Sequence, residues 1–482
     1  MDVKVVGNAG KTEMLCFFLT EERSKEIKAG KRKAPKPVAD AIKAGDFAGE
    51  TDQVAQLCGD GQAKRMFLVG LGKKAETSTE SVRRASSIAA GEAVALKLKE
   101  LSVVADNGVD GEPSAAAEGA ALGMYDYDKY KKKKAKKLAL LNVVFSGNLA
   151  KANAEARKAV TIAEGTNMAR DWTNEPSDVL NPMACAELAQ TLAKAHGIKC
   201  TVLDEKELKR LGMNLMLSVC AGSRFQARLV LLEYSHGSGK PVVLLGKGVT
   251  FDSGGLNLKP SGYIETMKSD KAGAMTVLAT MVTLARLKAK VNAIGVMALV
   301  ENMIGPNASK PGAIVKSYDG KTVEIADTDA EGRLVLADAL AYAAKRYKPK
   351  LLLDLATLTG SVLVTFGEYV AAVLGTDDKE AEALFKAGQR TYERVWRLPL
   401  YKEYEDEMKG DISDLRNVGY KLGRYAGTIT GGAFLKQFTG KAPWLHIDIA
   451  GTSWFDKPRY YTPKGATGFG VRLLADYLTS GK

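Results

Sequence analysis

The second half of the chain contains the run Asp327-Thr328-Asp329-Ala330-Glu331-Gly332-Arg333-Leu334, with carboxylates at three alternate positions before a glycine and an arginine. Residues 322–326, just before it, alternate polar and apolar side chains and predict a half-buried strand. Residues 334–347, just after it, have apolar side chains at helical spacing and predict a helix. The acids therefore lie at a strand-to-helix junction, and α/β sheets bind ligands at such strand ends.

Two simpler interpretations also fit these acids. Thr328 and Glu331 match a helix capping box in which Thr328 is the N-cap residue. The spacing also resembles a calcium-binding loop formed by Asp327, Asp329, Glu331 and Gly332. In that loop the twelfth position would be Asp338 instead of Glu, and a strand would replace the entering helix. A second polar cluster upstream favours a functional site over both interpretations.

The upstream cluster follows an apolar strand predicted at residues 242–245. Four glycines within residues 246–255 allow the backbone to approach another group closely. The segment is not a phosphate-binding P-loop, because Lys247 is followed by glycine instead of Ser or Thr. Asp270, read alone, is an N-cap candidate for an apolar helix at residues 272–287. Both stretches together place these groups at strand ends or helix starts: Lys247, Asp252, Lys259, Asp270, Asp329, Glu331 and Arg333.

The length of 482 residues is enough for two or three domains, and a hydrophobic content of 46% is typical of a globular protein. Strand-like and helical patterns alternate along the chain, which predicts an α/β fold with mostly parallel sheets. We expect a smaller N-terminal α/β domain (1–150), a connecting helix (151–174) and a larger C-terminal catalytic domain (175–482) with a mostly parallel central sheet. An Asn-Glu-Pro turn at residues 174–176 ends the connecting helix.

The N-terminal domain is predicted to have strands at residues 3–6, 14–19, 65–69, 102–105 and 138–145, and a helix at residues 81–101. The C-terminal domain is predicted to have further strands at residues 200–203, 229–234, 291–300, 351–355, 371–374 and 445–449. Several are almost wholly apolar, as in strands covered on both faces.

Composition excludes several classes of protein. No apolar run is long enough to span a membrane, and the N-terminus lacks a signal-peptide pattern, so a cytoplasmic protein is expected. Five scattered cysteines without a CxxC pair indicate reduced thiols. With only three histidines and no HExxH motif, any catalytic metal must be held mainly by carboxylates.

The net charge of +13 comes partly from one lysine-rich run at residues 129–137. A solvated loop or helix face is the favoured interpretation. The alternative is a patch that binds nucleic acid or another anion. The nearby Tyr125, Tyr127 and Tyr130 are compatible with this alternative. The absence of interleaved arginines argues against sequence-specific recognition.

Several motifs resemble the signature of the leucine (cytosol) aminopeptidases. They are Lys247-Gly248-x-Thr250-Phe251-Asp252-Ser253-Gly254-Gly255, then Asp270, the run Thr328 to Leu334, Asp354-Leu355-Ala356-Thr357-Leu358-Thr359-Gly360, Asp448-Ile449-Ala450-Gly451 and Gly465-Ala466-Thr467-Gly468-Phe469-Gly470. The resemblance covers most of residues 175–482, and a variable N-terminal domain with a long connecting helix also fits it.

The resemblance implies a two-metal exopeptidase that releases leucine and other, mainly apolar, N-terminal residues from peptides through a metal-bridged hydroxide. By resemblance, one metal is bound by Lys247, Asp252, Asp270 and Glu331, and the other by Asp252, Glu331 and Asp329. A mainly oxygen ligand set accommodates Mn or Zn, and also Mg. Lys247 can coordinate only as a neutral amine, and neighbouring cations lower the pKa of such a lysine.

The same resemblance implies roles for the remaining groups. Lys259 and Arg333 are the catalytic pair, with Lys259 stabilising the oxyanion and Arg333 binding a bicarbonate at a helix start. The substrate-binding positions are Met267, Thr357, Leu358 and Gly360. The family also implies a homohexamer, arranged as a dimer of trimers, with oligomer contacts in the N-terminal domain.

Three positions depart from the usual family pattern. Asp327 stands where many members carry Asn, which adds a negative charge beside the metals. Lys271 follows Asp270 where an apolar residue is usual, and Asp178 replaces a usual Asn in the turn after the connecting helix. None removes an expected ligand. The alternatives to an active peptidase are a nucleic-acid-binding protein that uses the lysine run and an inactive relative kept as a scaffold.

Overall fold

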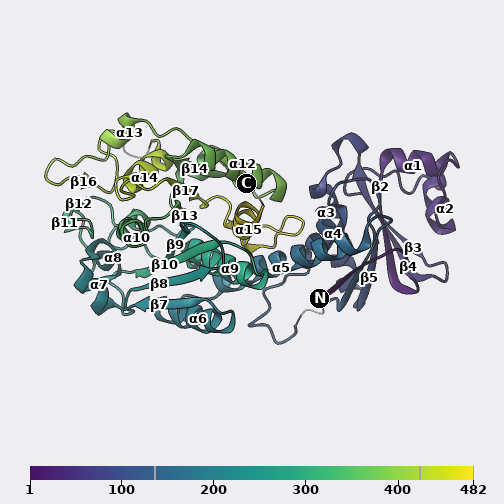
Figure 1. The fold of residues 1–482 in the computed structure, drawn as a ribbon. Coiled ribbons are helices and arrows are strands. Elements are labelled where there is room, and N and C mark those ends of the chain that lie inside the picture. The colour runs from purple at the N-terminus through teal and green to yellow at the C-terminus, as the bar shows by residue number, and fades with distance from the viewer. Residues whose placement is uncertain (135–136, 423–424, 481–482) are drawn as a thin grey trace. The chain divides into compact units, whose positions relative to one another are not determined.

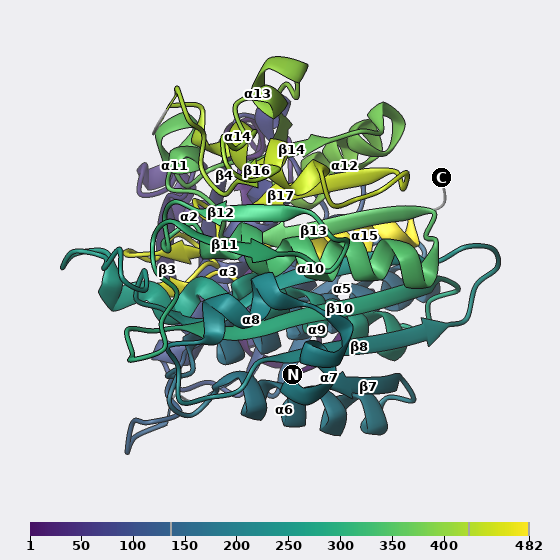
Figure 2. The same ribbon diagram turned by 90° about the vertical axis from the view of Figure 1, so that its left-hand side faces the viewer.

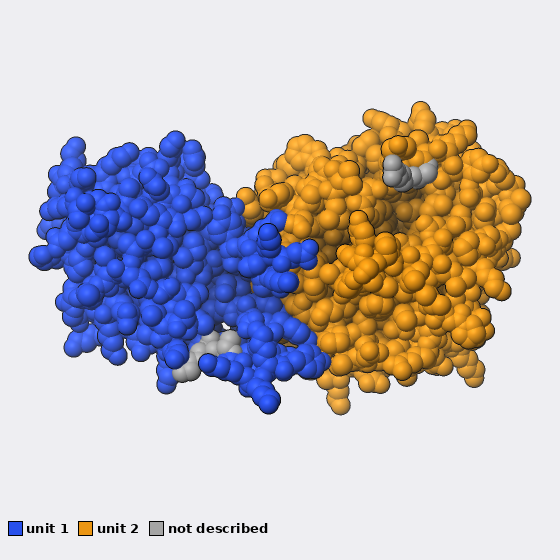
Figure 3. All heavy atoms as spheres, turned by 180° about the vertical axis from the view of Figure 1, so that it is seen from behind, with its two compact units in different colours: residues 1–167, 456–464 blue, residues 168–455, 465–482 orange. Residues whose placement is uncertain are grey.

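The computed structural model describes residues 1–134, 137–422 and 425–480. The chain divides into two compact units: residues 1–167 with 456–464, and residues 168–455 with 465–482 (Figure 3). Both units are α/β, so the predicted fold class is confirmed. The helix α5 (Leu149–Asn174) begins within two residues of the predicted connector and ends at its last residue. The domain boundaries drawn on either side of this connector stay predictions.

The N-terminal unit is built on a six-stranded sheet with the order β1-β6-β5-β2-β4-β3 (Figure 1). All neighbouring strands are parallel except β3 and β4. The strands are β1 (Asp2–Val6), β2 (Thr12–Thr20), β3 (Val54–Cys58), β4 (Ala63–Gly72), β5 (Glu100–Val104) and β6 (Leu140–Val144). The helices are α1 (Glu21–Lys28), α2 (Lys36–Ala44), the 3-10 turn η1 (Lys74–Glu76), α3 (Thr79–Ala95) and α4 (Glu112–Gly123).

Two elements of this unit differ from the sequence-based expectation. The helix expected at residues 81–101 ends at Ala95, because Lys97 adopts a left-handed conformation (φ 61°) and Leu101 belongs to β5. The edge strand β3 was not predicted. Its side chains are only half-buried or exposed, so its sequence lacks the apolar pattern on which strand prediction relies.

The C-terminal unit is built on an eight-stranded sheet with the order β15-β14-β17-β13-β9-β10-β8-β7. Figure 2 shows β17, β13, β10, β8 and β7 following one another across it. The central strands β17, β13, β9 and β10 are mutually parallel. Strand β8 pairs antiparallel with both β10 and β7, and β14 pairs antiparallel with β17 but parallel with β15. Its strands are β7 (Lys199–Leu203), β8 (Arg228–Ser235), β9 (Val242–Asp252), β10 (Asn292–Asn302), β13 (Leu351–Ala356), β14 (Ala371–Gly375), β15 (Val395–Arg397) and β17 (Trp444–Asp448).

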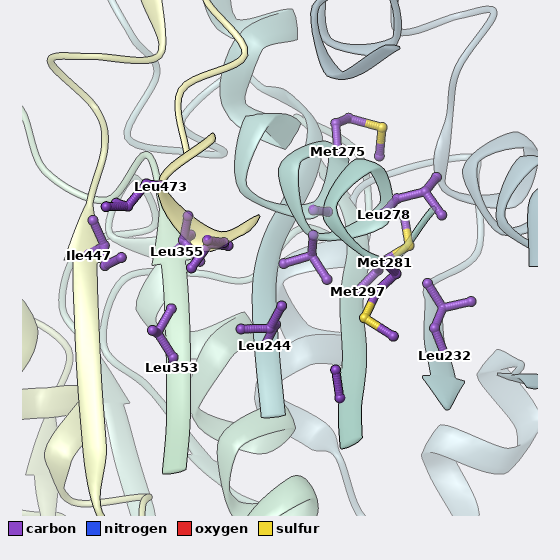
Figure 4. Packing of buried hydrophobic residues seen from close by; sticks show 14 of the residues in the cluster. Leu232, Leu244, Met275, Leu278, Met281, Met297, Leu353, Leu355, Ile447 and Leu473 are labelled. Carbon is purple, nitrogen blue, oxygen red and sulfur yellow. The ribbon is translucent and has the colours of Figure 1, made fainter. Parts of the chain in front are cut away.

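Helices cover both faces of this sheet, and alternate residues of β9 enter the two cores. Leu244 belongs to a hydrophobic cluster that includes residues of α6 (Pro182–Ala195), α9 (Ala272–Arg286), α12 (Asp378–Thr391) and α15 (Val471–Thr479), as Figure 4 shows in part. Val243 and Leu245 belong to a second cluster that includes residues of α7 (Glu205–Leu211), α8 (Asn214–Cys220), α10 (Glu331–Tyr347) and α14 (Gly427–Lys436). A strand buried on both faces fixes its own register firmly, and that register places the polar residues at its end.

Smaller elements surround the carboxyl ends of the central strands. A three-stranded sheet combines β11 (Ala313–Lys316), β12 (Thr322–Ile325) and β16 (Leu415–Arg416), and a two-stranded one combines β18 (Trp454–Phe455) and β19 (Gly465–Ala466). The remaining helices are η2 (Ile264–Lys271), α11 (Ser361–Phe366) and α13 (Lys402–Asp406).

Among the residues that the structure describes, no helix is both long and apolar enough to cross a membrane.

Candidate metal centre

The last residues of β9 bring the first two predicted ligands to the edge of the sheet. Lys247 lies within the strand and Asp252 ends it, and both side chains are buried. Gly332 makes room for the lysine: a Cβ on that glycine would lie 2.6 Å from the Nζ and Cε atoms of Lys247. A glycine in the first turn of α10 is therefore required for the lysine to pass this close.

Lys247 joins two of the predicted ligands that come from other elements. Its Nζ atom lies 2.9 Å from Oδ1 of Asp270, at the end of η2, and 2.7 Å from Oε1 of Glu331, the first residue of α10. It also donates a hydrogen bond of 2.8 Å to the carbonyl oxygen of Thr357. Three segments distant in sequence therefore meet around one buried amine.

Lys259 joins the other two carboxylates. Its Nζ atom lies 2.9 Å from Oδ2 of Asp252 and also forms an ion pair with Asp329. Asp252, Asp329 and Glu331 each offer an oxygen within 4.8 Å of the other two. All five side chains predicted to bind metal thus belong to one cluster, together with the lysine predicted to act in catalysis.

The electrostatics of the cluster fit divalent cations. Burial, reinforced by the neighbouring Asp252 carboxylate, raises the pKa of Asp329 to about 7, and burial also raises the pKa values of Asp252 and Asp270. The Oδ2 atom of Asp270 is buried and has no hydrogen-bond partner among the described residues. Burial and mutual repulsion make the charged form of these carboxylates unfavourable, and one of their oxygens has no hydrogen-bond partner in the part of the chain that the structure describes. A hard divalent cation bound by such oxygens would stabilise the charged form.

The two lysines respond to these acids in the same direction. Burial opposes the ammonium form of Lys247, but the carboxylates of Asp270 and Glu331 outweigh it and raise the pKa. Burial likewise opposes the charge on Lys259, and Asp252 with Glu331 outweighs it. Lys259 therefore remains a cation at neutral pH. Lys247 must give up a proton before its nitrogen can coordinate a metal.

Arg333 lies in the first turn of α10 and is buried. Its Nη1 atom donates a hydrogen bond of 2.6 Å to the carbonyl oxygen of Asn417. Burial lowers the pKa of Arg333 to about 10, with Glu331 acting in the opposite direction, so the guanidinium keeps its charge at neutral pH. A cation at a helix N-terminus suits the binding of a small anion.

The predicted substrate-binding loop follows β13. The Thr357 hydroxyl donates a hydrogen bond of 2.7 Å to Oδ1 of Asp270, and the Leu358 N–H donates one of 3.1 Å to Oδ1 of Asp448. Asp448 also accepts a bond of 2.6 Å from the Thr359 hydroxyl. The loop is thus attached both to the acidic cluster and to the end of β17. Gly360 is exposed at its end, and Met267 is half-buried in η2.

Both capping interpretations are wrong. The N-cap residue of α10 is Ala330, and the Thr328 hydroxyl instead donates to the carbonyl oxygen of Gly254 at 2.6 Å. Asp270 does not cap α9, whose N-cap residue is Lys271. Its Oδ1 atom instead accepts from Lys247 and from Thr357. Both polar side chains serve long-range contacts that local sequence patterns do not reveal.

The three departures from the family pattern lie in different surroundings. The Asp327 carboxylate accepts a hydrogen bond of 2.8 Å from the N–H of Asp329, inside the acidic loop. Lys271 is fully buried, and its ammonium donates to the carbonyl oxygens of Glu175 (2.9 Å) and Lys268 (2.6 Å). Asp178 forms an exposed ion pair with Arg224.

The described lysines of the lysine-rich run are exposed, and two of them are paired within their own loop. Lys131 lies 3.2 Å from a carboxylate oxygen of Asp126, and Lys134 lies 3.9 Å from one of Asp128. The run also includes Lys129, Lys132, Lys133 and Lys137, while Lys136 lies outside the described residues. These local pairs favour the solvated-loop interpretation, and nucleic-acid binding stays an untested alternative.

Sequence reasoning missed three buried residues that support the cluster: Asn302, Asn417 and Asp448. Asn302 and Asn417 carried no signal, because a single asparagine in a loop is usually a turn residue. Asp448 belongs to the motif Asp448-Ile449-Ala450-Gly451, but the sequence analysis predicted no role for it.

Taken together, the fold and the cluster define a protein of two α/β units with a buried centre of carboxylates and lysines that suits divalent metal ions. The chain matches the models for the cytosol aminopeptidase family, catalytic domain, over residues 167–475 and N-terminal domain over residues 17–134. The chain therefore belongs to the cytosol aminopeptidase family and is an aminopeptidase.

Similar proteins agree with this assignment over nearly their whole length. A probable cytosol aminopeptidase of Geobacter sulfurreducens is 42% identical over 452 residues, covering 92% of this chain and 90% of the relative. One from Cenarchaeum symbiosum is 39% identical over 477 residues, with coverage of 97% and 96%. Among solved structures, the bottromycin maturation enzyme BotP in complex with Mn has a TM-score of 0.87 and 32% identity, with coverage of 97% and 99%. A tomato leucine aminopeptidase variant has a TM-score of 0.88 and 29% identity, with coverage of 100% and 97%.

Proposed function

We propose that this protein releases leucine and other, mainly apolar, residues from the N-termini of peptides in a reaction that requires two divalent metal ions. The observation that carries the proposal is the convergence of Lys247, Asp252, Asp270, Asp329 and Glu331 on one buried cluster. The names of similar proteins, leucine aminopeptidase among them, support the substrate class.

The ligands divide into two overlapping sets. Lys247, Asp252, Asp270 and Glu331 would hold one ion, and Asp252, Asp329 and Glu331 would hold the other. Bound divalent ions supply Lewis acidity and lower the pKa of a coordinated water toward neutrality. Mn is favoured by the Mn complex of BotP, and Zn and Mg also accept such ligands.

The chain's own residues would perform the remaining tasks. Lys259 remains an ammonium beside Asp252 and Asp329, where it would stabilise the negative charge that develops on the substrate carbonyl. Arg333 would bind a bicarbonate that carries the proton, so no side-chain base is needed. The first side chain of the peptide would lie against Met267 and the loop Thr357 to Gly360, and the Leu358 backbone would orient the peptide.

A hydrolysis assay tests the proposal. Protein stripped of metal with a chelator should not hydrolyse leucine p-nitroanilide, and activity should return on adding Mn or Zn. In a panel of amino-acid anilides, leucine should be cleaved faster than aspartate or lysine. Full activity after exhaustive metal removal would contradict the metal requirement, and a preference for charged residues would contradict the substrate class.

Assembly and location are part of the proposal and rest on family membership. We propose a homohexamer made of two trimers and a location in the cytoplasm. Light scattering measures the assembly directly, and a monomeric mass would contradict it.

A further inference from the structure

The acidic loop between β12 and α10 carries Asp327 and Asp329, yet no regular element holds its backbone. The N-cap residue of α10, Ala330, makes no side-chain capping bond. The position of Asp329 therefore depends on whatever binds the peptide groups on either side of it. Two buried asparagines, Asn417 and Asn302, perform this task from different elements, beside the exposed Asn257, whose Oδ1 atom accepts from the Thr328 N–H at 3.0 Å.

Asn417 binds the loop through both atoms of its amide. Its Oδ1 atom accepts hydrogen bonds from the N–H groups of Ala326 (2.8 Å) and Asp327 (3.3 Å). Its Nδ2 atom donates to the carbonyl oxygens of Asp327 (2.6 Å) and Ala330 (3.3 Å). Only the amide side chains of asparagine and glutamine offer two N–H donors and a carbonyl acceptor together, and glutamine is longer by one methylene.

The backbone of Asn417 extends the same role to Arg333. Its N–H donates to the carbonyl oxygen of Glu324 at 3.0 Å, which continues the pairing of β16 with β12. Its carbonyl oxygen accepts the 2.6 Å bond from the Arg333 guanidinium. One fully buried residue thus fixes the strand before the loop, the loop itself and the arginine after it.

Asn302, at the end of β10, completes the set. Its Nδ2 atom donates to Oδ1 of Asp252 at 2.8 Å and to the carbonyl oxygen of Thr328 at 3.1 Å. It therefore sets the distance between the carboxylate that ends β9 and the residue just before Asp329. The two asparagine amides hold the carbonyls of residues 327, 328 and 330, and neither contacts the carbonyl of Asp329.

We infer that Asn417 and Asn302 are positioning residues for the metal centre, with Asn417 also orienting Arg333; this inference rests on the proposed two-metal function. Asn302 sets the orientation of a carboxylate ligand, and Asn417 holds the loop that presents Asp329. Groups that orient metal ligands typically change metal affinity or activity by about 10–100-fold when removed.

The test measures Mn²⁺ binding to chelator-stripped protein by electron paramagnetic resonance, beside kcat and KM for leucine p-nitroanilide. Asn417→Ala and Asn302→Ala should each weaken Mn²⁺ binding by about tenfold or more. Asn417→Ala should also lower kcat, because the backbone carbonyl that accepts from Arg333 remains but its segment is no longer tied to the acidic loop by the amide. Asn417→Asp keeps the size and the acceptor but cannot donate to Asp327 and Ala330, so it should weaken binding as well.

Asn153→Ala is the matched control. In α5, Asn153 holds the backbone of Val5 in the same way, with bonds of 2.8 Å to its N–H and 2.9 Å to its carbonyl. This variant should bind Mn²⁺ within about twofold of the parent protein, since it loses two comparable bonds outside the centre. Folded Asn417 and Asn302 variants with unchanged Mn²⁺ affinity would overturn the inference.

Other outcomes separate the inference from the proposed function. If Asn417→Ala does not fold, Asn417→Asp and Asn302→Ala decide the result through the same Mn²⁺ titration. If the parent protein binds Mn²⁺ but hydrolyses no anilide, the proposed function fails while the binding comparison still tests the asparagines. An active parent whose variants bind Mn²⁺ normally refutes the asparagine inference alone.

Discussion

Gly332→Ala should abolish most of the activity while leaving the fold intact. Alanine is favoured over glycine in a helix by about 1 kcal/mol, so α10 by itself should gain stability. The added Cβ, however, would lie 2.6 Å from Nζ and Cε of Lys247. Carbon atoms in contact prefer about 3.5–4.0 Å, so the lysine must move by about 1 Å.

That movement should change the stability of the fold little but lower the rate of hydrolysis. The clash falls on the far end of a flexible side chain, which can shift without distorting the backbone of β9. The same shift separates Nζ from Asp270 and Glu331, now 2.9 and 2.7 Å away. A misplacement of 1 Å in a reacting constellation costs about 100-fold in rate. We therefore expect kcat/KM for leucine p-nitroanilide to fall by about 100-fold, with weaker Mn²⁺ binding.

Gly91→Ala supplies the control, because Gly91 lies inside α3 and a Cβ there would meet nothing within 4 Å. This variant should keep full activity and gain up to about 1 kcal/mol in unfolding free energy. The reasoning is refuted if Gly332→Ala hydrolyses the anilide at close to the parental rate with unchanged Mn²⁺ affinity. Loss of folding in Gly332→Ala alone would instead show that Lys247 cannot move.

Three further variants test the surroundings of the centre. Lys259→Ala should lower kcat by more than about 100-fold, as loss of an oxyanion donor does. Lys199→Ala, the control, removes an exposed ion pair with Glu233 and should leave kcat unchanged, so equal rates for the two variants would reject a catalytic role for Lys259. Asp448→Ala leaves the Leu358 N–H and the Thr359 hydroxyl without their acceptor, so kcat/KM should fall at least about tenfold, and parental kinetics would show that the loop holds its shape without Asp448. Burial raises the pKa of Asp338 from 3.8 to about 7, so the folded protein keeps a proton that the unfolded chain loses, and its stability falls by roughly 4 kcal/mol at most as pH rises from about 4 to about 7. Asp338→Asn removes this loss, so the unfolding free energy of the variant relative to the parent, measured in urea, should rise between pH 5 and pH 8. A difference that stays constant with pH would contradict the raised pKa.

The predictable part of the site lies where sequence periodicity is strong. The apolar run that becomes β9 placed Asp252 after a strand, and the structure has it as the last residue of β9. The alternating pattern of β12 placed Asp329 at a strand-to-helix junction, and the structure has it in the loop between β12 and α10. Their meeting could not be read from the alternation of strands and helices, because β9 belongs to the central sheet and β12 to the separate three-stranded sheet. Assigning individual ligands required the resemblance to the family, because an isolated carboxylate at a helix start fits a cap equally well.

What the sequence could not reveal are the contacts whose partners are far apart along the chain. Helix capping was an alternative for Thr328 and Asp270 because capping depends only on neighbours, whereas their actual partners are 74 and 87 residues away. Helix α3 was extended too far for the same reason: nothing local signals that Leu101 joins a sheet with residues 140–144. Tertiary hydrogen bonds decided each case, and local propensity is weak against them.

The placement of Asn417 shows why a distant segment is needed at this centre. Carboxylates confined together repel one another, so a loop carrying Asp327 and Asp329 beside Asp252 would open unless its backbone were tied down. Within the loop itself the Asp327 carboxylate accepts from the Asp329 N–H, but α10 begins without a side-chain cap. Strand β16 supplies what is missing: by pairing with β12 it delivers an asparagine whose amide binds the loop on both sides of Asp329. The repulsion that makes the centre attractive to divalent ions is thus opposed by neutral hydrogen bonds, which hold the ligands in place without competing for the cations.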